Sequence, residues 1–197
     1  MSIADKLTTI AENQQKVYDA GKQAEYDRFW DNFQDYGEAN VGSNAFMYGW
    51  NDESFNPKYP IKISHSMSKV FSYNTRITDT KVDIFILGTT QQIFYQCSNL
   101  KTVRKLIVTT ASTYSNMFTG CSALENLAIE GTIASAFKIS DCKKLSKASI
   151  ESIFSCLSDT TTGLTATFST TAKDNAFTTE EWNTLVASKP NWTIALA

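Results

Sequence analysis

The residues best suited to chemistry are four cysteines and a single histidine, His65. Thiolates are strong nucleophiles, and together with imidazoles they are the usual ligands of structural zinc. No two cysteines form a CxxC pair and one histidine cannot complete a Cys2His2 set, so we expect no metal site and no other cofactor. The cysteines are Cys97, Cys121, Cys142 and Cys156.

Enzymatic activity needs a constellation of groups that the sequence does not display. His65 lies among serines in "ISHSMS", but no G-x-S-x-G nucleophile motif accompanies it. Glu180 and Glu181 lie at the start of a predicted helix, where carboxylates stabilise the helix dipole. No glycine-rich phosphate-binding motif occurs. We therefore predict no enzymatic activity and no catalytic residues, and a hydrolase built around His65 is the alternative that alanine substitution would test.

Composition and charge exclude further classes of function. The 197-residue chain has 42% hydrophobic residues, a net charge of -2 and no concentrated basic cluster, which argues against nucleic-acid binding. No run of about 18 apolar residues predicts a membrane span. The first residues, "MSIADKLTTIAENQQ", do not have the pattern of a Sec signal, so we expect no Sec signal and no disulfides.

Three of the cysteines occupy one position of a repeated segment. The segments are "VFSYNTRI" (70–77), "IFYQCSNL" (93–100), "MFTGCSAL" (117–124) and "KISDCKKL" (138–145). The shared position holds Asn74, Cys97, Cys121 and Cys142, at spacings of 23, 24 and 21 residues. Repeats of this length indicate a solenoid whose equivalent residues stack. Because cysteine tolerates burial as a small hydrophobe, we predict that these four residues form a structural ladder and are not reactive.

The unit "MFTGCSALENLAI" resembles the BspA-type leucine-rich repeats found in gut bacteria and in their phages and prophages, and the resemblance covers residues 62–158. Two further segments resemble proteins of phages of Firmicutes. They are "IADKLTTIAENQQKVYDAGKQAEYDRFWDNFQ" and "GWNDESFNPKYPIKI". A long bacterial adhesin array would have more than about four units, an export signal and a wall anchor. The resemblance therefore implies a virion component.

The first 36 residues have the heptad spacing of a coiled-coil seam. Apolar residues alternate at steps of four and three, with one polar exception. The seam residues are Ile3, Leu7, Ile10, Gln14 and Val17. We predict an oligomerising or docking helix; an amphipathic helix packed on its own domain is the alternative.

These elements predict an α+β protein made of an N-terminal helix, a short leucine-rich-repeat β-solenoid and a C-terminal α/β cap. Strand-like runs at 82–87, 105–109 and 127–131 supply the solenoid. A helix at 146–159, an alternating strand at 164–170 ("LTATFST"), a helix at 178–190 and a short final strand come next. The predicted segments are the helix at 1–36, an aromatic-rich connector at 37–61, the repeats at 62–158 and the cap at 159–197.

The expected function is that of a non-enzymatic bacteriophage virion protein, such as a head fibre, decoration or tail-tip component. Its partners would be copies of itself, for example in a trimer, other virion proteins, and a glycan or protein of the host surface. Tyr95 and Tyr114 are candidates for stacking on sugars, and packing within the repeats is the alternative role for them. It would be made in the host cytoplasm and end in the virion. A bacterial leucine-rich-repeat adhesion or protein-interaction module is the alternative.

Overall fold

The computed structural model describes residues 9, 10, 12–17, 20, 21, 24, 60–63, 68–109 and 112–197. The described residues between 9 and 24 are helical, and the others form strands and three further helices. The strands are β1 (Ile61–Ile63), β2 (Asp83–Ile86), β3 (Thr89–Gln91), β4 (Thr102–Val108), β5 (Thr113–Ser115), β6 (Asn126–Gly131), β7 (Phe137–Lys138), β8 (Leu164–Phe168) and β9 (Trp192–Leu196). The helices are α2 (Lys147–Cys156), α3 (Thr170–Ala176) and α4 (Thr179–Ala187).

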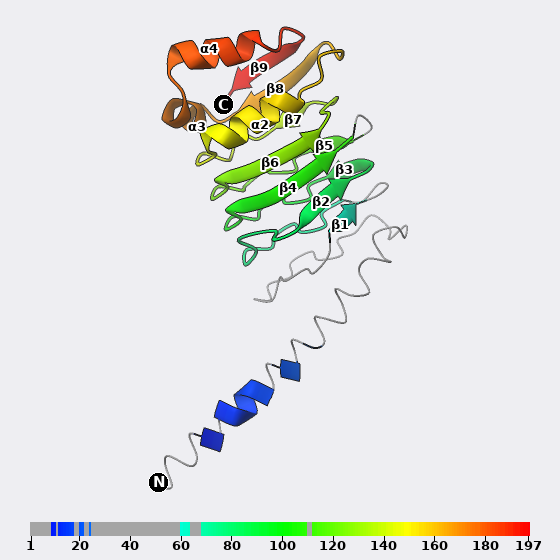
Figure 1. Cartoon of the computed structure of the whole chain (residues 1–197), viewed down its shortest axis with the longest axis vertical. Coiled ribbons are helices and arrows are strands. Elements are labelled where there is room, and N and C mark those ends of the chain that lie inside the picture. Colours follow the sequence, from blue (N-terminus) through cyan, green and yellow to red (C-terminus); the bar gives the residue numbers. More distant parts are fainter. Residues whose placement is uncertain are drawn as a thin grey trace.

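Every pairing between the described strands is parallel. One sheet has the order β1-β2-β4-β6, a second pairs β3 with β5, and a third has the order β7-β8-β9. Figure 1 shows the strands following one another along the domain, with α3 and α4 at the end that carries β9. Parallel neighbours require a crossover connection between each pair, and this requirement explains the regular spacing of the repeated segments.

The fold class predicted from the sequence is wrong. The structure is a small α/β domain with parallel sheets and few helices, not an α+β arrangement of a β-solenoid and a separate cap. The deciding feature is β7, which lies before α2 in the chain and pairs with β8 after it. Strands β8 and β9 therefore extend a sheet that begins within the repeated region. A constant repeat length predicts parallel neighbours, but it does not show that helices connect strands of one sheet.

Helix α2 stands beside β6, the last strand of the largest sheet, in place of a further strand. The Ser149 hydroxyl accepts a hydrogen bond from the backbone N–H of Leu127 at 2.9 Å, and the Ser152 hydroxyl accepts one from Ile129 at 2.9 Å. Two side chains three residues apart on one helix face therefore satisfy alternate N–H groups of the strand. This arrangement protects an edge that would otherwise attract another strand.

A column of aromatic rings fills the core between the sheets. Phe94 stacks between Phe71, at a ring-centroid distance of 5.3 Å, and Phe118, at 5.7 Å. The interplanar angles are 19° and 10°, so the rings lie nearly parallel. All three rings are fully buried. The repeat spacing thus places one phenylalanine of each unit directly against the next, as offset stacking favours.

The predicted helices at 146–159 and 178–190 are confirmed, as α2 and α4. Ser146 caps α2, and Thr178 begins α4 with a capping box completed by Glu181. Helix α3 was not predicted, although Ser169 provides its N-cap. Trp182 of α4 closes this end of the core through edge contacts with three rings. Its partners are Phe154, Phe168 and Phe177.

Candidate functional site

The structure brings the four predicted ladder residues into one buried column. Each cysteine of the ladder donates its thiol hydrogen to a backbone carbonyl of the preceding unit. The sulfur–oxygen distances are 2.9 Å from Cys97 to Phe71, 3.0 Å from Cys121 to Phe94 and 3.8 Å from Cys142 to Phe118. The thiols thus satisfy carbonyl groups inside the core.

Asn74 occupies the same position in the first unit and replaces the thiol contact by a local one. Its Oδ1 accepts hydrogen bonds from the backbone N–H groups of Arg76 and Ile77, both at 3.0 Å. Such a side-chain turn is the usual role of a buried asparagine in a tight bend. The two residue types at this position therefore bond differently, cysteine to the preceding unit and asparagine within its own bend.

Burial makes these thiols poor nucleophiles. It raises the pKa of Cys97 from 9.0 to about 12, and it raises the pKa values of Cys121 and Cys142 well above the ordinary value. Cys156, which is also buried, has a raised pKa for the same reason. The thiolate is the reactive form of cysteine. Because these thiols are protonated and buried, they should not react at neutral pH. All four cysteines are free thiols.

The raised pKa values predict a loss of stability in alkali. In the unfolded chain the thiols ionise near pH 9, whereas the folded chain retains their protons. The stabilising contribution is therefore complete below pH 9 and is lost as the pH rises towards 12. At pH 10 the loss is about 1.4 kcal/mol each for Cys97 and Cys142. In urea unfolding, the decrease in the free energy of unfolding between pH 8 and pH 10 should be smaller by about 1.4 kcal/mol in Cys142→Ala than in the parent chain. Equal decreases in the two proteins would contradict this prediction.

The other candidate groups found in the sequence do not assemble into a reactive centre within the described residues. His65 lies outside them. Glu181 caps α4, accepting from the backbone of Thr178 and from the Lys147 ammonium at 2.7 Å. The hydrogen bond from Lys147 holds the pKa of the Glu181 carboxyl below its usual value. Among the residues that the structure describes, no group of three metal-ligating side chains occurs.

The seam of the predicted N-terminal helix is described only in part. Ile3 and Leu7 lie outside the described residues. Ile10 and Val17 are helical, and 52% and 74% of their surfaces are exposed. With Gln14 and Asn13 they line one hollow on the helix surface. Large aliphatic side chains exposed at heptad spacing are what an oligomerising helix presents before assembly.

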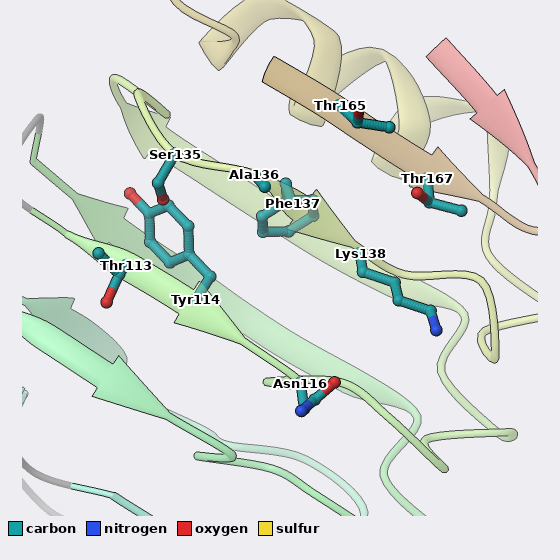
Figure 2. A pocket seen from close by; sticks show the side chains of 9 residues that line it. All are labelled: Thr113, Tyr114, Asn116, Ser135, Ala136, Phe137, Lys138, Thr165 and Thr167. Atoms are coloured by element: carbon teal, nitrogen blue, oxygen red, sulfur yellow. The ribbon is translucent and has the colours of Figure 1, made fainter. Parts of the chain in front are cut away.

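A pocket of about 410 Å³ lies where the second and third sheets meet. Strands β5 and β7 are neighbours there, yet they do not pair, and the hollow opens between them (Figure 2). Its floor contains the buried rings of Tyr114 and Phe137, whose centroids lie 5.7 Å apart. The remaining lining residues are Thr113, Asn116, Ser135, Ala136, Lys138, Thr165 and Thr167.

Side chains alternate between the two faces of each strand, and this alternation determines which residues line the pocket. Tyr114 and Phe137 point into the core, so Thr113 on β5 and Lys138 on β7 point outwards. On β8, Thr165 and Thr167 face the pocket on either side of buried Ala166 (Figure 2). Asn116 comes directly after β5 with a φ of 53°, a left-handed conformation that asparagine tolerates.

Sequence reasoning missed this pocket. The alternating threonines of "LTATFST" indicated a strand with one polar face, which is the available signal for Thr165 and Thr167. It also offered Tyr95 and Tyr114 as rings for stacking on sugars. Tyr114 is only 2% exposed, and burial raises the pKa of its hydroxyl to about 12. The ring of Tyr95 packs edge-on against Tyr73 at 5.4 Å.

In a second hollow, between α2 and α4, the lysine that lines it is already paired. It is lined in part by Lys147, Phe177 and Glu181. The Lys147 ammonium lies 5.0 Å from the centre of the Phe177 ring and forms the ion pair with Glu181. We therefore take the pocket beside β5, β7 and β8 as the candidate functional site.

Comparisons of the chain with models of protein families, with curated proteins and with solved structures found no match. Among the described helices, none combines the length and the apolar character needed to cross a bilayer.

Proposed function

We propose that this chain is a non-enzymatic structural protein of a bacteriophage virion, which displays its parallel α/β domain for binding to a host surface. The resemblance of its repeated units and N-terminal segment to phage proteins supports the assignment to a virion. In this proposal the chain is made in the host cytoplasm and is incorporated into the particle as a head fibre, decoration or tail-tip component.

The observation that carries the binding role is the polar pocket over a fully packed core. Hydroxyl and amide groups line it, while the aromatic column beneath holds the strands in place. A rigid scaffold that positions a few polar groups around a hollow is typical of a binding site. The cysteines, which are the strongest nucleophiles of the sequence, serve the core instead.

We further propose that the N-terminal helix joins copies of the chain, for example as a trimer, or docks them on other virion proteins. Replacing both Ile10 and Val17 by aspartate should then convert a defined oligomer of 21.9 kDa chains into a monomer. Aspartates at these seam positions should destabilise the oligomer because their charges would become buried on assembly. Light scattering coupled to gel filtration measures the mass.

The matched control for this prediction is Lys16→Asp, at an exposed helical residue outside the seam. It should leave the oligomer intact. A wild-type chain that is already monomeric, or equal effects of the seam and control substitutions, would contradict the role given to this helix.

Mass spectrometry of gradient-purified particles tests the assignment to the virion. The chain should occur at a constant copy number relative to the major capsid protein and remain with the particles after a high-salt wash. A chain found only in the soluble lysate would overturn the assignment. Capsid and tail genes beside its gene would also separate the virion protein from the alternative, a bacterial adhesion or interaction module.

A further inference from the structure

The pocket beside β5, β7 and β8 holds polar groups that no other part of the described structure uses. Within the described residues, the side chains of Thr113, Asn116, Thr165 and Thr167 make no hydrogen bond. Ser135 is different, because its hydroxyl donates to the carbonyl of Ser112 at 3.0 Å. The free groups come from separate segments of the chain and line one hollow (Figure 2).

The kinds of free group indicate a ligand rich in hydroxyls. Threonine hydroxyls and an asparagine amide both donate and accept hydrogen bonds, and they match groups that do the same. The rings of Tyr114 and Phe137 lie beneath these groups and are almost fully buried, so they support the hollow without offering a face for stacking. A volume of about 410 Å³ lies within the range of small-ligand pockets.

The charge of the lining indicates an acidic group on that ligand. Lys138 is exposed, and among the described residues that line the pocket it is the only charged one. Its ammonium makes no ion pair with a described residue. An unpaired ammonium at the edge of a polar hollow favours a carboxylate or phosphate through a charge-assisted hydrogen bond.

We propose that this pocket binds a saccharide that carries a carboxylate or phosphate group. The inference deepens the proposed binding to a host surface and rests on it. Asn116, Thr165 and Thr167 would bond the sugar hydroxyls, and Lys138 would select the acidic group.

The probe is an array of microbial glycans with uronic-acid, phosphate-bearing and neutral members, followed by calorimetric titration of the strongest binder with the full chain. We expect acidic glycans to bind in preference to their neutral counterparts. Lys138→Met keeps the aliphatic stem and should weaken binding of the acidic glycan about tenfold or more. Thr167→Val keeps the shape of the side chain and should weaken binding by about three- to tenfold.

The matched control is Thr193→Val on β9, which is exposed and pairs in register with Thr165 but does not line the pocket. It should bind like the parent chain. No binding to any glycan, equal binding of acidic and neutral members, or equal effects of Thr167→Val and Thr193→Val would overturn the proposal. These outcomes are independent of the mass spectrometry of particles, so this inference can fail while the assignment to the virion stands.

Discussion

Replacing Phe94 by alanine is expected to lower the free energy of unfolding by about 3–5 kcal/mol. The ring is fully buried and lies between two others, 5.3 Å from Phe71 and 5.7 Å from Phe118. Its removal takes away both stacking contacts and leaves a cavity that the neighbouring strands cannot close, because their registers are fixed by parallel pairing. Urea unfolding followed by tryptophan fluorescence and circular dichroism gives the value.

Phe85→Ala is the matched control for this substitution. Phe85 lies on β2 between the buried residues Ile84 and Ile86 and is only half-buried. The same truncation there should cost about 1–2 kcal/mol. A cost for Phe94→Ala no greater than that for Phe85→Ala would show that the aromatic column does not hold the sheets together.

Gly131→Ala is expected to destabilise the domain by about 3–5 kcal/mol. Gly131 ends β6 with a φ of +104°, a conformation that residues with a side chain rarely adopt. An added Cβ would also overlap the carbonyl oxygen of Val108, its partner in β4. That oxygen belongs to the backbone and cannot rotate away, so the pairing between β4 and β6 must open. Thermal and urea unfolding measure the loss.

Gly163→Ala separates the two causes. Gly163 has a φ of +73°, but an added Cβ there would meet no atom within 4 Å. Only the conformational cost remains, about 1–2 kcal/mol. If the two alanine variants lose the same stability, the contact with Val108 is not the deciding factor and the account of the β4–β6 pairing is wrong.

The parts of the fold that the sequence predicted are those fixed by local chemistry or by regular spacing. Ser146 and Thr178 precede apolar runs of helical period, and both cap the helices expected there. The spacing from Asn74 to Cys142 indicated stacked units, and these residues do lie in one column. Spacing alone does not reveal how the chain continues after the last unit. Strands β7 and β8 lie on either side of α2 in the sequence, and their pairing depends on tertiary packing. This pairing is the reason that the predicted fold class is wrong.

The candidate site was harder to predict than the core. Buried residues repeat, so their role is visible in the pattern, whereas the pocket exists because β5 and β7 lie side by side without pairing. Like the paired strands β3 and β5, these strands lie one repeat length apart, so no local signal in the sequence marks the break. Thr165 and Thr167 belonged to a recognisable polar face, but Asn116 and Lys138 carried no distinguishing context.

Electron cryomicroscopy of purified particles tests the central claim most directly, because it asks whether the chain is a displayed part of a virion. The proposal predicts a projecting density on the head or tail that fits the parallel α/β domain and is missing from particles made without the gene. Particles with identical density whether or not the gene is present would contradict the proposal.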